Sequence, residues 1–383
     1  MNSLKSILII SALHFGLLLT GSNGEGSFRY NRMKGESDSL ELAAKLSAIQ
    51  KAVEAARMTL NIPGMALAIV KDDRVILMQG YGFRDVEAGL PVTSETLFNI
   101  ASITKTVTAL AIVISADKGR ISLEDSPKKF LSYFKLRDSD ADSRVNLRDL
   151  LSHRTGVPND LGGDWYNRYH SRESLIKAAM QSKPTGTFRK HFSYNNFMVL
   201  AAGEALGKAY QTTYEEVVGN LVFAPVGMEK SNFSAAAMEQ TGDFSYGYSD
   251  DKSRRKFPPS RIDFLEREAP AAAMNSNVRE LAQLLRLFLN RGVVNGMRLM
   301  SDQAFNEMQA SHASTRSGHY ALGLFIEERD GHRVYFHTGG VSGFGSRFEF
   351  IPDHNLGFVV LTNVDDNRLP KAVREIVYEN LVE

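Results

Sequence analysis

The strand-like runs of this chain lie near its two ends, and a long helical stretch separates them. Residues 65–70 and 74–79 are β-rich and flank Asp72-Asp73, a dipeptide that is typical of hairpins. Beyond residue 300, strand-like patterns return in four runs, at 320–326, 333–337, 346–351 and 356–361. We therefore expect an α+β fold with one antiparallel sheet built from both ends of the chain.

Hydrophobic residues at helical spacing mark the rest of the chain. The runs at 42–60 and 369–381 predict helices that flank the sheet. Between them, the clearest predicted helices are at 175–180, 197–206 and 278–289. We expect one domain over residues 38–383, divided into two lobes. The α/β lobe would contain residues 38–122 and 301–383, and the inserted, mostly helical lobe residues 123–300.

The N-terminal residues are typical of a secretory signal peptide. Lys5 precedes an apolar core at 7–19, which is too short to cross a bilayer comfortably, and small residues follow as far as Gly24. We expect residues 1–24 to be the signal peptide; a buried or anchoring helix is the alternative. Residues 25–37 are polar and rich in Gly and Ser, so we expect a linker. Cleavage would leave a periplasmic or secreted protein without a stable membrane span.

Composition excludes several classes of protein. The formal net charge is +1, which gives no field that favours nucleic acid. The chain has no cysteine, and this excludes disulfides, thiol catalysis and cysteine zinc sites. His332 and His337 lie on one predicted hairpin, but no Asp or Glu completes a zinc set. We expect neither a metal nor a cofactor.

Ser102 and Lys105 open a predicted helix that runs to about Lys118 and is apolar nearly all round in its middle. Residues three apart lie on one helix face, and a buried amine of lowered pKa can accept a proton from a serine hydroxyl. Ser-x-x-Lys spacing by itself is weak evidence, because it recurs from Ser115, Ser126, Ser174 and Ser253. Only the pair at 102 begins a helix that we expect to be buried.

Two further groups have suitable chemistry. Tyr194 and Asn196 lie in a loop before a predicted helix, where a phenol can relay a proton and an amide can donate and accept hydrogen bonds. The run His337-Thr338-Gly339-Gly340 ends a predicted strand, and its glycines allow close approach of a substrate backbone. Backbone N–H groups at 102 and 340 are candidate oxyanion donors.

Together, Ser102-x-x-Lys105, Tyr194-x-Asn196 and His337-Thr338-Gly339 resemble the three motifs of the serine β-lactamase and penicillin-binding-protein superfamily. The chain is most similar to the class C branch, which includes carboxylesterases, D-Ala-D-Ala carboxypeptidases and D-aminopeptidases. The likeness spans roughly residues 40–380 and includes four lesser matches. These are Asn61-Ile62-Pro63-Gly64, Leu150 to Gly156, Pro225 to Met228, and Leu361-Thr362-Asn363.

The resemblance implies a role for each motif residue. Ser102 would be the nucleophile, and Lys105 would accept its proton or hold Tyr194 in an anionic or proton-accepting state. Tyr194 would protonate the leaving group and activate the deacylating water, while Asn196 would orient Lys105 and the substrate. Thr338 and Gly339 would line the site, and the N–H groups of Ser102 and Gly340 would form the oxyanion hole.

The third motif departs from the β-lactamases, which carry Lys where this chain has His337. Histidine is mostly neutral near pH 7 and attracts a substrate carboxylate less. Related carboxypeptidases also use an arginine on the preceding strand, and the similar stretch 321–325 has none. Arg333 and Arg347 are possible substitutes, although we expect both to be solvated. These departures favour esters or weakly charged amides over β-lactams.

We therefore expect a carboxylesterase-like serine hydrolase that acts on a small ester, amide or peptide. The alternatives are a D-Ala-D-Ala carboxypeptidase or β-lactamase, a penicillin-binding sensor that acylates without turnover, and a binding protein on an inactive scaffold. His153 next to Ser152 is a possible base, but we expect its loop to be structural. Gly340-Val341-Ser342-Gly343-Phe344 lacks the second glycine of a nucleophile elbow, because Phe344 is in its place. The loops at 162–170 and 245–264 would shape the pocket, and their sequences do not identify a substrate.

Overall fold

The computed structural model describes residues 24–382, with side chains from Ser39 onward. Two compact units meet between Ala48 and Ile49. The predicted signal peptide lies outside the described residues except for Gly24. Over the predicted linker at 25–37 the backbone is helical, because helix α1 begins at Gly24 and ends at Thr59. Extending a helix costs less than starting one, so α1 continues through this polar segment.

The described elements follow one another in a β–α–β order. The α-helices after α1 are α2 (Thr104–Asp117), α3 (Ser139–Arg144), α4 (Leu147–Leu151), α5 (Trp165–Arg168), α6 (Arg172–Gln181), α7 (Asn196–Tyr210), α8 (Tyr214–Val218), α9 (Ala224–Val226), α10 (Ala235–Gln240), α11 (Ala269–Ala272), α12 (Val278–Leu289), α13 (Asp302–Gln309) and α14 (Arg368–Leu381). The 3-10 and π segments are η1 (Ala101–Ile103), η2 (Pro127–Lys129), η3 (Gly219–Phe223), η4 (Pro259–Glu268) and η5 (Pro352–His354).

The strands near the N-terminus are β1 (Gly64–Lys71), β2 (Arg74–Asp85), β3 (Leu90–Pro91) and β4 (Phe98–Asn99). Short pairs in the middle are β5 (Gly247–Tyr248), β6 (Lys256–Phe257), β7 (Asn275–Ser276), β8 (Val293–Val294) and β9 (Met297–Arg298). The C-terminal strands are β10 (Ala313–Thr315), β11 (Gly318–Tyr320), β12 (Phe325–Arg329), β13 (His332–Val341), β14 (Phe344–Ile351) and β15 (Leu356–Thr362).

One antiparallel sheet joins the two ends of the chain, which confirms the predicted fold class. Its order is β10-β11-β12-β13-β14-β15-β1-β2-β3. The join is the pairing of β1 with β15, in which Met65 lies opposite Thr362 and Lys71 opposite Leu356. Every residue of β15 is buried, as expected for a central strand covered on both faces.

The predicted strand at 320–326 is wrong in its centre. The chain turns between β11 and β12 at Gly323, which has a φ of +72°. A Cβ there would lie 2.6 Å from the Lys105 carbonyl oxygen, so glycine lets this turn rest directly on α2. Thr106 Oγ1 donates a hydrogen bond to the Gly323 carbonyl at 2.7 Å and holds the contact. By contrast, the hairpin predicted at Asp72-Asp73 is present, with both residues at positive φ.

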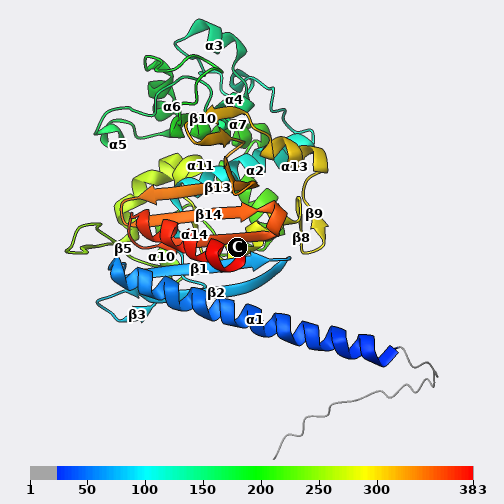
Figure 1. Cartoon of the computed structure of the whole chain (residues 1–383). Helices are drawn as coiled ribbons and strands as arrows, with labels where there is room; N and C mark the ends of the chain where they lie inside the picture. Colours follow the sequence, from blue (N-terminus) through cyan, green and yellow to red (C-terminus); the bar gives the residue numbers. More distant parts are fainter. Residues whose placement is uncertain (1–23, 383) are drawn as a thin grey trace, which may run out of the picture. The chain divides into compact units, whose positions relative to one another are not determined.

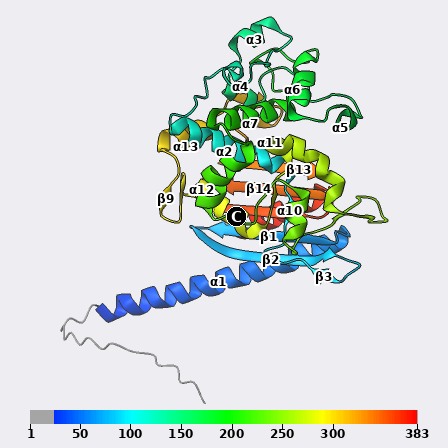
Figure 2. The ribbon, with the colours of Figure 1, turned by 180° about the vertical axis from the view of Figure 1, so that it is seen from behind.

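Helices cover both faces of the sheet. Helix α14 packs on β14 and β15 on one face, in front of the sheet in Figure 1. Helix α12 packs on β1, β14 and β15 on the other face and is in front in Figure 2. The ring of Phe288 on α12 stacks on Phe350, with centroids 5.2 Å apart. Helix α12 lies within the predicted helical lobe, and its strongly apolar face packs on the sheet.

Helix α2 passes through the core between the sheet and the helices of the upper lobe (Figure 1). Its residues from Thr104 to Ser115 are all buried, which confirms the burial predicted from their apolar pattern. Burying each Val, Leu or Ile side chain there stabilises the fold by about 1.5–3 kcal/mol. The core therefore fixes the position of the helix that follows Ser102. Among the described residues, no helix is both long and apolar enough to cross a membrane.

Candidate active site

Ser102 and Lys105 lie side by side at the start of α2. Ser102 is in the 3-10 turn η1, just before the helix rather than inside it, and Lys105 is in the first turn of α2. Lys105 Nζ donates a hydrogen bond to Ser102 Oγ at 2.9 Å and another to the Ala271 carbonyl at 2.8 Å. Ser102 is partly exposed, whereas Lys105 is only 1% exposed. An accessible hydroxyl thus contacts a buried amine.

The backbone before Ser102 is strained. Ala101 has a φ of +48°, a left-handed conformation that costs a non-glycine residue about 1–2 kcal/mol. Two buried hydrogen bonds hold it. Asn99 Oδ1 accepts from the Ala101 N–H at 2.9 Å, and Ser346 Oγ donates to the Ile100 carbonyl at 2.8 Å. Such strain concentrates at functional sites, where the surrounding structure maintains it.

Burial controls the charge of Lys105. It lowers the pKa of the amine below its ordinary value of 10.5, because little water remains to solvate the ammonium. The carboxyl group of Glu268 opposes part of this effect. The amine also lies 4.9 Å from the centre of the Tyr194 ring. Lys105 can therefore be deprotonated far more easily than a surface lysine.

Tyr194 completes the contact from the other lobe. Burial raises the pKa of Tyr194 above its ordinary value of 10.0, and the nearby Ser102 hydroxyl opposes part of this rise. The phenol is therefore protonated at neutral pH, which speaks against the anionic form that the resemblance allows. Asn195 fixes the backbone on its C-terminal side, because its Oδ1 caps α7 by accepting from the Met198 N–H at 2.9 Å.

His153 packs against Tyr194. Their ring centroids are 4.5 Å apart, and the Tyr320 ring lies 4.8 Å from His153 on another side. The Asn195 N–H donates to His153 Nδ1 at 3.1 Å, so the proton of the neutral ring is on Nε2. Burial lowers the pKa of His153 well below its ordinary 6.5. His153 thus contacts the candidate site as a packing partner of Tyr194, in keeping with the structural role we expected for its loop.

His337 is an internal residue and not a charged group in the cleft. It is 1% exposed, and burial lowers its pKa to about 3, so the imidazole is neutral at pH 7. Its Nδ1–H donates to the Thr338 carbonyl at 2.7 Å, and the Tyr320 hydroxyl donates to its Nε2 at 3.1 Å. The sequence did not point to Tyr320, because its partner lies 17 residues away on another strand.

Asn196 does not make the contact with Lys105 that the resemblance implies. Lys105 donates instead to Ser102 and Ala271, as above, and the Asn196 side chain is near the carboxyl group of Glu268, where it favours the ionised form of that carboxyl. Glu268 is 1% exposed, and burial raises its pKa above the ordinary 4.5. Nothing in the local sequence distinguishes Glu268 from the acidic residues around it, so the sequence analysis missed it.

A buried carboxylate holds the loops that carry His153 and Tyr194. Asp149 on α4 is completely buried and pairs with Arg154 at 2.7 Å and with Arg189 at 2.9 Å. The same two loops are joined by the hydrogen bond from the Ser193 N–H to the His153 carbonyl, at 2.8 Å. Two arginines from separate loops thus converge on one carboxylate.

Strand β13 brings the third motif to Ser102. Gly339 lies against the carbonyl oxygen of Ile100, where a Cβ would overlap it, so glycine is required for β13 to approach η1. Next to it, a Cβ on Gly340 would lie 2.7 Å from Asp365 Oδ1. Partial desolvation and the carboxylates of Asp250 and Asp366 raise the pKa of Asp365 to about 6. The backbone of Gly340 is therefore bordered by a carboxylate. Thr338 lies opposite Arg347 in the register of β13 with β14.

Neither candidate arginine is placed as a clamp. Arg347 is buried, which corrects our expectation that it is solvated. Its Nε donates to Glu349 at 2.6 Å, and its guanidinium lies 4.6 Å from the centre of the Phe336 ring. Arg333 pairs with Glu328 at 3.1 Å in an exposed contact. Both cations are already neutralised by carboxylates.

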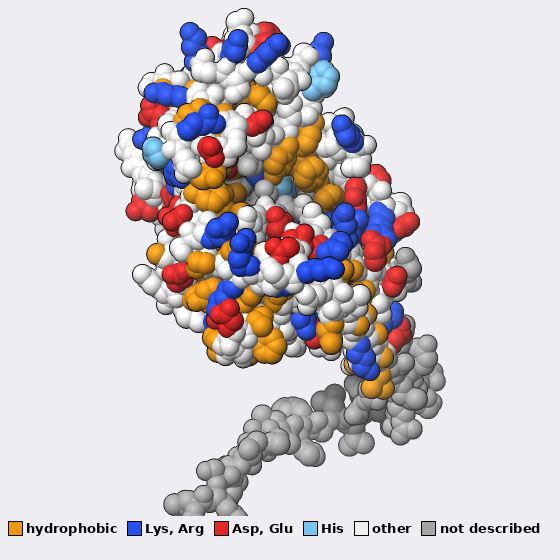
Figure 3. Space-filling view, turned by 90° about the vertical axis from the view of Figure 1, so that its left-hand side faces the viewer, with side chains coloured by type: hydrophobic (Ala, Val, Ile, Leu, Met, Phe, Trp, Pro, Cys, Tyr) orange, Lys and Arg blue, Asp and Glu red, His pale blue; other side chains and the backbone are white. Residues whose placement is uncertain are grey.

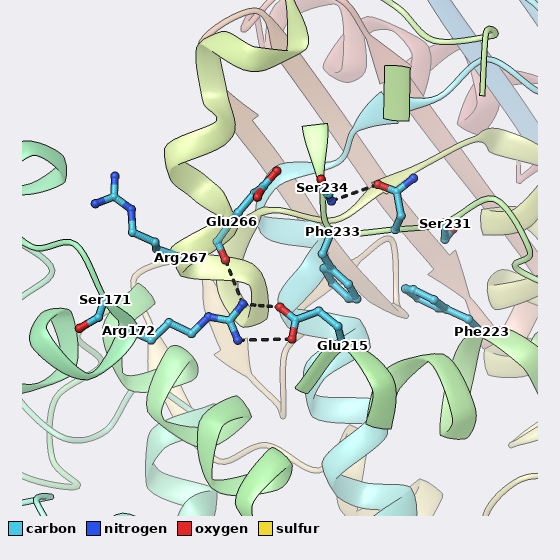
Figure 4. Close-up of a pocket in the computed structure, with 10 residues that line it drawn as sticks. Ser171, Arg172, Glu215, Phe223, Ser231, Phe233, Ser234, Glu266 and Arg267 are labelled. Atoms are coloured by element: carbon cyan, nitrogen blue, oxygen red, sulfur yellow. Dashed lines mark hydrogen bonds and ion pairs between the residues drawn. The ribbon is translucent and has the colours of Figure 1, made fainter. Parts of the chain in front are cut away.

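Figure 3 shows a hollow across one face, with hydrophobic side chains along its upper rim and acidic side chains below. A separate pocket of about 660 Å³ has no motif residue in its lining. Figure 4 shows Arg172 there between Glu215 and the Glu266 carbonyl, so its charge is already paired. The described residues contain no group of three or more His, Cys, Asp or Glu side chains placed to bind a metal.

Comparison with known proteins identifies the family. The family model described as Beta-lactamase matches residues 49–379, so the chain belongs to the beta-lactamase family. This confirms the resemblance drawn from the three motifs. Protein flp of Staphylococcus aureus (strain N315) is 26% identical over 330 residues, which are 86% of this chain. The aligned part is 65% of Protein flp, so the chain spans slightly less than two thirds of that relative.

Solved structures share the fold. The octameric penicillin-binding protein homologue from Pyrococcus abyssi is 26% identical, with a TM-score of 0.78, and the match covers 88% of this chain and 78% of that one. The class C beta lactamase from Rhodobacter sphaeroides (19% identical, TM-score 0.74) and EstCE1 (18% identical, TM-score 0.75) each match over 88% of this chain and 99% of theirs. EstCE1 is described as a hydrolase with promiscuous acyltransferase activity. The chain thus has the β-lactamase/transpeptidase-like fold of this family.

Proposed function

We propose that this protein is a carboxylesterase-like serine hydrolase that cleaves small, weakly charged esters through an acyl-enzyme on Ser102. The observation that carries the proposal is the contact of Lys105 Nζ with Ser102 Oγ at 2.9 Å, next to the Tyr194 hydroxyl. A buried amine of lowered pKa is a suitable base for a serine hydroxyl.

In the proposed acylation, the Ser102 O–H bond breaks, its proton moves to Lys105 and Oγ attacks the ester carbon. The N–H groups of Ser102 and Gly340 would stabilise the oxyanion. The ester C–O bond then breaks, and the leaving alkoxide takes its proton through Tyr194, which Lys105 reprotonates. Water enters, gives its proton to the same pair and releases the acid, which restores the Ser102 hydroxyl.

Charge near the site supports an uncharged substrate. His337 is neutral and internal, and the guanidinium groups of Arg333 and Arg347 are already paired. The nearest charge to Gly340 in this region is the carboxylate of Asp365, which repels an anionic substrate. EstCE1, which shares the fold, is described as a hydrolase with promiscuous acyltransferase activity, while the class C beta lactamase keeps β-lactams open as substrates.

The test is kcat/KM for p-nitrophenyl acetate and butyrate, nitrocefin and a D-Ala-D-Ala peptide. We expect the esters to be hydrolysed fastest, and Ser102→Ala to abolish turnover without loss of fold. A fluorophosphonate should label Ser102. Ser342→Ala, in the exposed turn after β13, is the matched control and should retain activity and labelling.

Each contrary result favours another function. Labelling at Ser342, Ser193 or Ser152 would refute the assignment of the nucleophile. Nitrocefin turnover that matches or exceeds ester turnover would indicate a β-lactamase, and preferred cleavage of the peptide would indicate a carboxypeptidase. A burst of product followed by no turnover would indicate a sensor that is acylated and not released.

A further inference from the structure

One buried carboxyl group has no role in the mechanism above. Glu268 is the last residue of η4, and three residues later the Ala271 carbonyl accepts the hydrogen bond from Lys105 Nζ. The short segment 268–271 therefore presents both a carbonyl and a carboxyl group to this part of the core. Glu268 is 1% exposed, so its charge has almost no access to water.

The side chains of Glu268 and Asn196 each have a buried oxygen without a hydrogen-bond donor in the described part of the chain. The Asn196 side chain favours the ionised form of Glu268, and Glu268 Oε2 and Asn196 Oδ1 are both buried with no hydrogen-bond partner among the described residues. Two unpaired buried acceptors are expensive in a region that only maintains the fold. A buried acid that contacts a motif residue and acts electrostatically on the candidate base is therefore a candidate functional group.

The other charged or titratable groups around Lys105 do not supply a negative charge. His153 and His337 both have lowered pKa values and are neutral, and the raised pKa of Tyr194 keeps the phenol protonated. Glu268 is the group that opposes the lowering of the Lys105 pKa. Arg267 is next to it in sequence and favours its ionised form.

We propose that Glu268 is a positioning residue that stabilises the ammonium which Lys105 becomes on accepting the Ser102 proton, and that it orients Asn196. This inference rests on the proposed role of Lys105 as base. The site would then be a Ser–Lys–Glu relay, in which the carboxylate supports Lys105 as the aspartate supports histidine in a Ser-His-Asp triad. Glu268 itself takes no proton in this step and does not touch the substrate.

Removal of the Glu268 carboxylate should therefore have two effects, one on the pH dependence of the reaction and one on its rate. The Glu268 carboxylate raises the pKa of Lys105, so its removal should move the acidic limb of kcat/KM to lower pH. Its removal should also slow the reaction above that limb, because the new ammonium loses its counter-charge. A residue with a purely structural role would slow the reaction without moving the limb.

The experiment compares Glu268→Gln with wild type in ester hydrolysis and in the rate of fluorophosphonate labelling of Ser102, each against pH. We expect the limb to move down by about one pH unit or more. The plateau should fall about tenfold or more. Glu268→Asp keeps the charge, so its limb should stay near that of wild type, and it provides a second variant if the glutamine substitution impairs folding.

Glu266→Gln is the matched control. Glu266 is on the same element η4, but its Oε1 accepts from the Ala235 N–H at 2.8 Å, and it lines the separate pocket (Figure 4). We expect this variant to retain the wild-type limb and plateau. An equal loss of hydrolysis rate in Glu266→Gln and Glu268→Gln would mean that both residues act only through the stability of η4. This result would overturn the proposal.

A direct titration separates this proposal from the proposed function. The protein with ¹³Cε-lysine gives one signal for Lys105, assigned by its absence in Lys105→Arg. Its midpoint should move to lower pH in Glu268→Gln, whether or not any ester is hydrolysed. An unchanged midpoint would overturn the Lys105–Glu268 coupling, whereas a shifted midpoint without Ser102 labelling would overturn only the hydrolase mechanism.

Discussion

The two halves of the candidate site are built in different ways. The helix half, Ser102 and Lys105, comes from one turn of chain where η1 meets α2, and the core buries Lys105 and the helix that follows as far as Ser115. The loop half, Tyr194 and Asn196 with the adjacent His153, comes from two loops and the first residue of α7, and hydrogen bonds and ion pairs hold these segments together. The helix half is therefore fixed by apolar packing, and the loop half by a few polar contacts. Each prediction below tests one half against the other.

The largest effect should come from removing the proton-transfer group of either half. Lys105→Ala and Tyr194→Phe should each lower kcat by about 10²-fold or more, because positioned proton-transfer groups contribute 10²–10⁴-fold. The double variant should lose little more than the worse single variant, since the two groups act as one unit. Steady-state kinetics of all three variants measures this. Additive losses would mean that the two halves work independently.

The next largest effect tests what holds the loop half. Asp149→Ala leaves Arg154 and Arg189 without their buried partner and should lower the free energy of unfolding by about 3–5 kcal/mol. Urea denaturation measures this loss. Glu173→Ala, which removes a half-exposed pair with Lys177, is the control and should cost less than about 1 kcal/mol. Similar losses in both variants would show that the loop half does not depend on Asp149.

A pH profile tests the charge of the helix half. Activity needs neutral Lys105, so kcat/KM should rise with pH, and the lowered pKa of Lys105 places this rise below pH 10.5. Below the limb the rate should fall about tenfold per pH unit, or more steeply where Glu268 titrates with the amine. The raised pKa of Tyr194 predicts no loss of activity up to about pH 10.

The control for this profile is His337→Gln. The imidazole is already neutral far below the limb, because its pKa is lowered to about 3. The limb should therefore remain where it is in the wild type. If the acidic limb disappeared in His337→Gln, the group that titrates would be His337 on β13 and not Lys105.

The smallest effect concerns substrate charge beside Gly340. Asp365→Asn should raise kcat/KM for the anionic nitrocefin about two- to fivefold at pH 7.5 and low salt, since an exposed charge contributes at most about 1 kcal/mol. Hydrolysis of p-nitrophenyl acetate should not change. Because the pKa of Asp365 is about 6, the wild type and the variant should converge below pH 5. An equal change for both substrates would refute a role of this carboxylate in substrate selection.

The sequence by itself determined the helix half and the frame around it. The Ser102–Lys105 spacing predicts their contact, because helix geometry fixes which residues are neighbours three positions apart. Strand-like runs at both ends predicted the single sheet, since such strands bury their apolar faces by pairing with each other. Periodicity placed α7, α12 and α14 to within a few residues of their observed bounds. These features depend on local geometry, which a short stretch of sequence contains.

The tertiary structure alone decided the electrostatics of the site. Glu268 and Tyr320 act through contacts between elements far apart in sequence. Arg347 pairs with Glu349 two residues away on β14, but only the fold buries the pair. The turn at Gly323 divides the predicted strand because α2 lies directly beneath it. The sequence does not show whether a carboxyl group, an imidazole or a guanidinium will lie in water or in the core. The pKa of such a group and its partner are set by the desolvation and the neighbours that folding supplies.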